Sequence, residues 1–222
     1  MKSNVISLSI ITALLAGLST PVYADPALAV KAGTLGLGVD LGGSVVPGVL
    51  NLRGELNGYT YDKYSFTSSN VNYNTKLKLQ SAGMLADWYP FHGSFRLTGG
   101  LYYDNNKLDL NATPTNGSYT INGHSYTSQQ VGNLAGRVSV DKSAPYVGIG
   151  WGNPVGSGGR WTVLADLGAL YQGSPKVSLN ASGAASNPQL ASDVQAARQK
   201  AQSDLAKYKW YPVASVGLAY NF

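Results

Sequence analysis

The residues that decide the fold read Ala214-Ser215-Val216-Gly217-Leu218-Ala219-Tyr220-Asn221-Phe222. Apolar or aromatic side chains stand at every second position, and small or polar residues stand between them. In an extended strand this period of two places the two kinds on opposite faces. A strand of a bacterial outer-membrane barrel needs such faces, because one meets lipid and the other meets the lumen. The sequence therefore predicts an all-β transmembrane barrel.

The aromatic end of this stretch predicts a role in assembly. Phe222, with Tyr220, Leu218 and Val216 behind it, resembles the C-terminal signal by which such barrels are recognised for insertion. We expect the barrel-assembly machinery to read these four residues and outer-membrane lipid to surround the folded, monomeric barrel.

The first residues predict export. Lys2 opens a basic region, Val5 to Leu18 is apolar, and Pro21-Val22-Tyr23-Ala24 offers a cleavage site. This pattern indicates a signal peptide over residues 1–24 and a barrel domain over residues 25–222, located in the outer membrane of a Gram-negative bacterium. The alternative, a membrane anchor, is disfavoured because the apolar stretch is short for a spanning helix.

The composition excludes several classes of chemistry. The chain has no cysteine, so it has neither disulfides nor thiol chemistry. Charged residues make up 12%, against roughly 25% in soluble domains. The net charge of +5 is explained by attraction to anionic lipid headgroups, and we expect no nucleic-acid partner for an exported barrel.

Seven segments alternate as membrane strands do: residues 35–41, 50–57, 76–85, 95–104, 146–151, 161–169 and 209–222. Residues 61–73 are expected to form a polar loop. Residues 111–133 are expected to be a long polar region that holds a small hairpin with an Asn-Gly turn at Asn122 and Gly123.

Two details refine these strands. Val138 and Val140 lie on the opposite parity to the strand that follows them, which predicts a bulge near Pro145. Lys176 to Leu179 is expected to carry the sixth strand beyond the membrane.

The topology requires one more strand, because bacterial single-chain barrels have an even number of strands and periplasmic termini. The short turns at 44–48, 90–93 and 152–159 then become periplasmic, and the long segments become extracellular. Only the region before residue 33 can supply the missing strand, so we predict it over Ala27–Ala32. The fold class is an eight-stranded antiparallel transmembrane β-barrel with one helix in a late extracellular loop.

That helix is predicted over residues 188–206. Asn187 is a suitable N-cap and Pro188 a suitable first helical residue. The apolar residues recur at helical spacing, at Leu190, Val194, Ala197, Ala201 and Leu205. We expect this stripe to cover the barrel mouth and restrict it. The alternative is a solvated helical loop.

The facing of the strands predicts an outer surface and a charged lumen. Outward-facing residues are expected to include Leu37, Leu52, Leu79, Leu101, Val163 and Leu218. Inward-facing ionisable residues are expected to be Asp40, Arg53, Glu55, Lys76, Lys78, Arg96, Asp104 and Asp166. Within this set, Asp40, Glu55 and Asp166 are expected to pair with Arg53 and Arg96. The lumen charges either select a zwitterionic or cationic solute or hold the strands together.

No catalytic centre is predicted. The two histidines, His92 and His124, fall at opposite ends of the barrel, and neither has a Ser/Asp constellation beside it in the sequence. There is no cluster of residues with metal-ligand spacing, so we expect no metal and no cofactor.

Five motifs carry a family resemblance: Asp87-Trp88-Tyr89-Pro90-Phe91, Phe95-Arg96-Leu97, Ala144-Pro145-Tyr146-Val147-Gly148-Ile149-Gly150, Gly173-Ser174-Pro175-Lys176-Val177 and Lys209-Trp210-Tyr211-Pro212-Val213. In this order they resemble a family of small proteobacterial outer-membrane barrels. The second half, at 144–153, 171–179 and 208–218, is similar to the carbapenem-associated, ornithine-uptake outer-membrane channel family of Acinetobacter. The resemblance implies an eight-stranded barrel and an uptake role.

Three functions stay open at this point. The first is a narrow passive channel or uptake barrel for small polar or cationic solutes. The second is a structural or surface-interaction barrel without transport. The third is an outer-membrane enzyme, which we do not expect.

Overall fold

The structure is a computed structural model that describes residues 23–68, 71–114, 117–155 and 161–222. The predicted signal peptide lies outside the described residues, apart from Tyr23 and Ala24 at its end. No helix in the described part of the chain is long and apolar enough to span a membrane.

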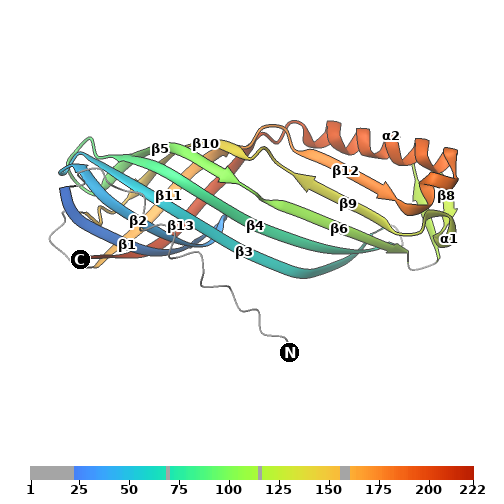
Figure 1. Ribbon diagram of the computed structural model, residues 1–222, viewed down its shortest axis with the longest axis horizontal. Helices are drawn as coiled ribbons and strands as arrows, with labels where there is room; N and C mark the ends of the chain where they lie inside the picture. Colours follow the sequence, from blue (N-terminus) through green and yellow to red (C-terminus); the bar gives the residue numbers. More distant parts are fainter. Residues whose placement is uncertain (1–22, 69–70, 115–116, 156–160) are drawn as a thin grey trace, which may run out of the picture.

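Eight antiparallel strands close into a barrel (Figure 1). They are β1 (Tyr23–Gly33), β2 (Gly36–Val46), β3 (Leu50–Ser68), β4 (Val71–Trp88), β5 (Phe95–Asp104), β10 (Ser143–Trp151), β11 (Trp161–Tyr171) and β13 (Trp210–Asn221). They pair in this order around the wall, and β1 pairs with β13 to complete the ring. The prediction of an eight-stranded barrel is confirmed.

The strand predicted over Ala27–Ala32 is present as β1. It lies between β2 and β13, with Val30 opposite Val39 on one side and Leu218 on the other. Residues directly opposite each other in a ladder point to the same face of the sheet. Val30, Val39 and Leu218 therefore form one apolar row. Without β1 the barrel would have two open edges.

One side of the wall continues beyond the barrel as an extension sheet. β3 and β4 run on into it, and β6 (Lys107–Pro114), β9 (Leu134–Ser139) and β12 (Lys176–Ala181) pair beside them in the order β3-β4-β6-β9-β12. The predicted loop over 61–73 is therefore wrong, since its described residues belong to the long β3–β4 hairpin. Lys176 to Leu179 does leave the barrel, but as a separate strand, β12.

The predicted bulge near Pro145 is also wrong. β10 pairs with β5 in one continuous register, from Ser143 opposite Tyr103 to Trp151 opposite Phe95. Val138 belongs to β9, a different strand. The change of parity therefore comes from a break between two strands rather than from a bulge within one.

A helix and a small hairpin cover the extension sheet. The hairpin consists of β7 (Ser118–Ile121) and β8 (His124–Thr127), joined at Asn122 and Gly123. Both turn residues have positive φ, 51° and 86°, as a type I′ turn requires. A short helix, α1 (Ser128–Val131), and a 3₁₀ turn, η2 (Ser182–Ser186), complete the cover.

The predicted helix is present as α2 (Pro188–Leu205). The Asn187 side chain caps it by accepting a hydrogen bond from the Leu190 N–H at 3.1 Å. Its apolar stripe packs on the extension sheet and the hairpin, so the expectation that it covers the barrel mouth is wrong. The buried cluster consists of Ala112, Tyr119, Ile121, Tyr126, Val131, Ala181, Leu190 and Val194.

Facing was predicted for seven of the eight barrel strands; six of them have the predicted facing, and that of β4 is inverted. Leu37, Leu52, Leu101, Val163 and Leu218 are exposed on the outer wall. Leu79 and Leu85, however, are buried inside the barrel, while Met84 and Trp88 face outward. Lys76 and Lys78 lie on the outward face of the extension sheet, beyond the lipid-facing part of β4, so these lysines are not in the lumen.

Aromatic side chains mark two membrane boundaries on the outer wall. One girdle lies near the short turns and includes Trp88, Trp151, Trp161 and Phe222. The other lies at the opposite rim and includes Tyr103, Tyr171 and Trp210. The span of β11 from Trp161 to Tyr171 is 11 residues, which matches a transmembrane β-strand. By the rule for bacterial barrels, the short turns lie in the periplasm and the extension sheet outside the cell.

Candidate functional site

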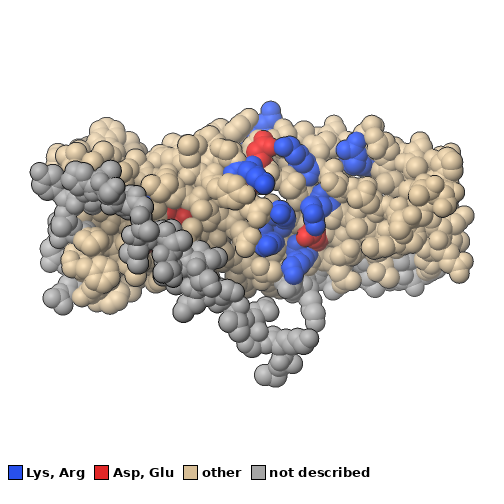
Figure 2. All heavy atoms as spheres, viewed as in Figure 1, with Lys and Arg blue, Asp and Glu red and all other residues tan. Residues whose placement is uncertain are grey.

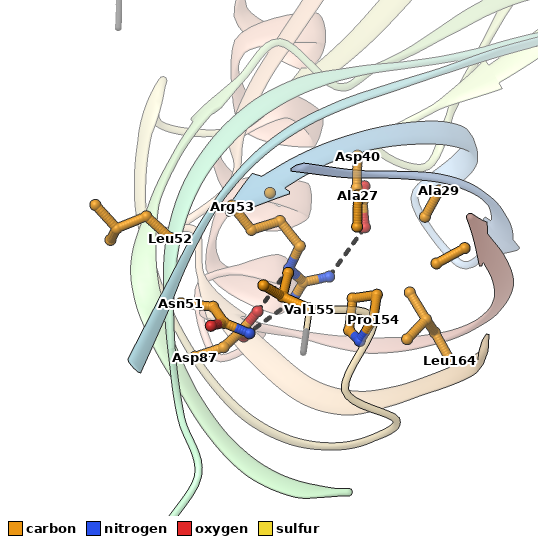
Figure 3. A pocket seen from close by; sticks show the side chains of 12 residues that line it. Ala27, Ala29, Asp40, Asn51, Leu52, Arg53, Asp87, Pro154, Val155 and Leu164 are labelled. Carbon is orange, nitrogen blue, oxygen red and sulfur yellow. Dashed lines mark hydrogen bonds and ion pairs between the residues drawn. The ribbon is translucent and has the colours of Figure 1, made fainter. Parts of the chain in front are cut away.

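The barrel lumen is crossed by a cluster of ion pairs centred on Arg53. Its guanidinium lies 3.0 Å from a carboxylate oxygen of Asp40 and 3.0 Å from one of Asp87. Figure 3 shows Arg53 reaching into the lumen between these two acids, which come from β2 and β4. A third acid, Asp166 on β11, lies 3.4 Å away. One cation thus bridges separate parts of the wall.

A second cation, Arg96, lies beside the first and is 1% exposed. Its Nη2 donates to Asp166 at 2.6 Å, and its Nε lies 3.6 Å from Asp87. Arg96 also donates to the carbonyl oxygen of Gly152, in the periplasmic turn. Asp87 additionally accepts a hydrogen bond from Thr98 at 2.7 Å. Shared acids therefore join the two arginines into one network.

Lys31 on β1 forms the third positive charge. Its ammonium pairs with Glu55 and lies 3.4 Å from Asp40. Asn57 donates to Glu55 at 2.6 Å and to Ser81 at 3.2 Å. We call this set the lumen cluster: Lys31, Asp40, Arg53, Glu55, Asp87, Arg96 and Asp166. It holds three basic and four acidic side chains, so with all of them ionised its net charge is −1.

An apolar layer lies on the extracellular side of the lumen cluster. It consists of Leu35, Leu85, Tyr102, Ala144, Tyr146, Leu170 and Val213. The Tyr102 and Tyr146 rings meet edge to face, 5.7 Å apart. Gly148 and Gly168 face each other across β10 and β11, and a Cβ at either position would overlap the Tyr146 hydroxyl. These glycines make the space that the tyrosine fills.

The periplasmic side is closed by the turn after β10. Val155 is buried, and the Asn153 side chain accepts a hydrogen bond from Asn51 at 3.1 Å. Two cavities flank the centre of the lumen cluster. One, of about 20 Å³, is lined by residues that include Asp40, Arg53, Asp87, Pro154 and Val155. The other, of about 10 Å³, lies near Lys31 and Glu55. Each has room for about one water molecule, so the described side chains leave little open space beside the lumen cluster.

The structure brings together all five residues predicted for the lumen network: Asp40, Arg53, Glu55, Arg96 and Asp166. Sequence reasoning missed Lys31 and Asp87. Lys31 alternates with Val30 and Ala32 on β1, and Asp87 precedes the outward Trp88, so parity with their neighbours could have identified both. Asp104 also faces inward but lies apart, where it accepts a hydrogen bond from Gln172 at 2.5 Å.

Three residues of the predicted assembly signal, Val216, Leu218 and Tyr220, lie on the outward face of β13, and Phe222 follows the end of the strand. Val216, Leu218 and Phe222 are exposed, and Tyr220 is half-buried. The Phe222 and Tyr220 rings meet edge to face at 5.3 Å, and Tyr220 packs in the same way on Trp161 at 4.9 Å. The four residues form a continuous apolar strip that reaches the periplasmic girdle.

A second polar cluster lies outside the membrane, where α2 meets the hairpin. The Asp193 carboxylate is 2% exposed and accepts hydrogen bonds from Asn122 at 3.1 Å and from Tyr126. It also lies 2.8 Å from His124 Nδ1 and accepts a longer hydrogen bond from Gln189. The hydrogen bonds, that of Tyr126 first, lower the pKa of Asp193 to about 2, and the same contact raises the pKa of Tyr126 to about 12. We call this set the Asp193 clasp.

His124 contributes to that clasp, while His92 lies in the turn between β4 and β5, at the other end of the molecule. Among the described residues, no group of three or more His, Cys, Asp or Glu side chains is arranged to hold a metal ion.

Comparison with solved structures finds similar molecules in Acinetobacter baumannii. The crystal structure of CarO2 has 26% sequence identity and a TM-score of 0.60, and the match covers 89% of this chain and 98% of that one. The crystal structure of CarO has 22% identity and a TM-score of 0.58, covering 89% and 97%, and it shares the fold. No protein-family model matches the chain, and no curated protein matches it.

A closed eight-stranded barrel with an apolar outer wall, two aromatic girdles and a charged lumen defines a bacterial outer-membrane β-barrel protein. Its location is the outer membrane. Within this class the chain is similar to the CarO proteins over nearly its whole length, which confirms the resemblance to the carbapenem-associated channel family.

Proposed function

We propose that the protein is a narrow passive channel for small polar or cationic solutes, closed in the conformation described above by the lumen cluster. One observation carries the proposal: the centre of the barrel is held by ion pairs rather than by close-packed apolar side chains. A packed apolar core is not continuously deformable. A cation between several acids can instead exchange one carboxylate for another.

The arrangement around Arg53 supports such an exchange. Its guanidinium already lies within 4 Å of four acids: Asp40, Glu55, Asp87 and Asp166. Rotation of the side chain toward either wall would retain charged partners for it and would widen the lumen on the other side. Opening the lumen in this way therefore costs less free energy than a movement that would leave Arg53 buried without a charged partner.

The charge balance supports a preference for cations. Four acids face three basic groups, so a passing ammonium or guanidinium group finds carboxylate partners as Arg53 moves aside. Rings of acidic side chains select cations in other channels by the same electrostatic principle. Anionic solutes would meet the excess of carboxylates and be repelled.

Planar-bilayer recording tests the proposal. Arg53→Ser removes the central cation and most of its volume, so we expect a higher single-channel conductance and stronger cation selectivity than in the parent. Arg137→Ser removes the same charge from the exposed Arg137–Asp109 pair on the extension sheet and serves as the matched control. Heat-modifiable gel mobility checks that each barrel is folded.

A surface-interaction barrel without transport is the second candidate, and the extension sheet favours it. Five strands, a hairpin and α2 project beyond the membrane from one side of the wall. If neither the parent nor Arg53→Ser conducts ions while both barrels are folded, the channel proposal fails and this second function remains.

A further inference from the structure

Basic side chains gather on the outer face of the molecule where the extension sheet leaves the barrel (Figure 2). We call this set the basic belt: Lys76, Lys78, Lys107, Arg137, Lys142 and Lys176. Two acids, Asp109 and Asp141, lie among them. Among the described side chains, six positive and two negative charges give the belt +4.

The register of the extension sheet places like charges side by side. Lys78 on β4 lies directly opposite Lys107 on β6. The same row continues through Ser139 on β9 to Lys176 on β12. Neighbouring strands are about 4.8 Å apart, so three lysines stand within about 15 Å along one row. Like charges directly opposite each other destabilise a sheet unless an anion lies between them.

The acids of the belt neutralise only the Lys176 end of this row. Asp109 pairs with Arg137, and Asp141 pairs with Lys176 at 2.7 Å. The described part of the chain gives Lys78 and Lys107 no ion-pair partner. Both side chains are half-buried on the outer face, so their positive charges are held close together. The row therefore lacks negative charge at the end where Lys78 and Lys107 lie side by side.

The position of the basic belt relative to the membrane indicates which group supplies the missing negative charge. Pairing of β4 with β5 ends at Ser81, three residues before Lys78 is reached along the wall. The Lys142 ammonium lies 5.9 Å from the ring centroid of Tyr103, a residue of the extracellular girdle. Aromatic girdles lie at the level of lipid headgroups. The belt consequently meets the headgroup layer of the outer leaflet.

We propose that the basic belt binds the phosphate groups of the phosphorylated glycolipid that forms the outer leaflet of this membrane. A phosphate between Lys78 and Lys107 accepts charge-assisted hydrogen bonds from both ammonium groups and removes their repulsion. The Ser139 hydroxyl and Lys176 lie further along the same row and can meet a second phosphate. The acyl chains of the same lipid then lie against the apolar outer wall below. A bound glycolipid would fix the base of the extension sheet to the membrane surface.

Native mass spectrometry of the full chain in detergent tests this proposal. The probes are lipid A with two phosphates, with one phosphate, and fully dephosphorylated. We expect affinity to fall with each phosphate removed. Lys78→Gln with Lys107→Gln should weaken binding of the two-phosphate form about thirty-fold, since each surface lysine contributes about 1 kcal/mol to binding of anionic lipid. Lys78→Arg with Lys107→Arg should retain binding.

A matched control removes two positive charges elsewhere. Arg198→Gln with Lys200→Gln lies on α2 and leaves the belt intact, so binding should be unchanged. Equal loss in this control, or equal binding of the dephosphorylated lipid, would overturn the proposal. Full competition by millimolar inorganic phosphate would identify a site for free phosphate instead. Retention of an acidic polypeptide but not of lipid A would identify a protein partner. Both of these results also overturn it.

Discussion

The barrel and the extension sheet share β3 and β4, yet the apolar face of β4 is reversed between them. Along β4 within the membrane, Met84 and Trp88 face outward while Ser81 and Asp87 face the lumen. Higher on the same strand, the outward face holds Lys78, and Leu77 lies on the inner face opposite Leu108 of β6. One strand thus changes which of its faces is apolar as it leaves the membrane.

The difference shows that the surroundings, rather than strand alternation, determine which face is apolar. In the barrel the outer face meets lipid, and the lumen can hold charges only because they pair with one another. In the extension sheet the outer face meets water and headgroups, and Leu190 and Val194 of α2 pack on the inner face at Ala112 of β6 and Ala181 of β12. The two regions therefore depend on different interactions, which single substitutions can separate.

The largest difference in folding stability between the two regions is expected when a positive charge is removed. Arg53→Met in the lumen leaves buried carboxylates without their partner, which we expect to cost about 3–5 kcal/mol of folding free energy. Arg137→Met removes an arginine of the extension sheet whose side chain is 58% exposed, and should cost less than about 1 kcal/mol. Urea unfolding in lipid vesicles measures both. Similar values for the two variants would mean that the lumen cluster is as well hydrated as the surface.

The next largest difference in stability is expected when a positive charge is added to the outward face of each region. Val216 lies in the middle of β13 and faces lipid, so Val216→Arg should destabilise the barrel by about 2–4 kcal/mol. Asn111 lies on the outward face of β6 in the extension sheet, where Asn111→Arg should change stability by less than about 0.5 kcal/mol. The same unfolding assay compares them. A large effect at Asn111 would place that part of the sheet in the membrane.

The reversal also explains what the sequence could and could not predict. Strand alternation predicted the barrel and helical spacing predicted the helix, because both depend on local periodicity. The eighth strand followed from the even strand number of bacterial barrels. The predicted facing of β4 is wrong because Lys76 and Lys78 alternate with leucines above the membrane. The same alternation, continued along the strand, puts Leu85 on the outer face, whereas it lies inside. Trp88, an outward aromatic residue at the periplasmic girdle, has the parity that gives the correct facing of this strand.

Pairings between distant segments could not be predicted in the same way. β6, β9 and β12 are each only six to eight residues long, and β9 and β12 pair across about 40 positions of sequence. The sequence instead predicted that Val138 belongs to the following strand through a bulge and that Lys176 to Leu179 continues the sixth strand. The lumen cluster was partly predictable, since its residues share inward parity, but which acid meets which base depends on strand stagger.

A smaller and purely local effect is expected at the Asp193 clasp. The pKa of Asp193 is lowered from 3.8 to about 2, so its ionised form stabilises the docking of α2 on the hairpin. This contribution is fully present above about pH 4 and is lost as the pH falls through 2. Pepsin should therefore cleave the extension of the parent at pH 2 but not at pH 4. Asp193→Asn should be cleaved at both, whereas the barrel should resist in all cases. Equal protection of the variant would show that the apolar cluster alone holds α2 in place.

The smallest expected effect tests whether the extension sheet and the barrel are stabilised independently. Asn187→Ala removes the side-chain hydrogen bond to the Leu190 N–H and should cost the first turn of α2 about 1 kcal/mol. Hydrogen exchange should become faster at Leu190 and its neighbours, about five-fold for that free energy. The amides of β11 and β13 should exchange as in the parent, because their hydrogen bonds lie within the barrel wall. Asn187→Ser, which keeps a capping oxygen, is the matched control and should restore slow exchange. Faster exchange across the barrel strands in Asn187→Ala would show that the helix stabilises the whole molecule, and the two regions would then have to be treated as one cooperative unit.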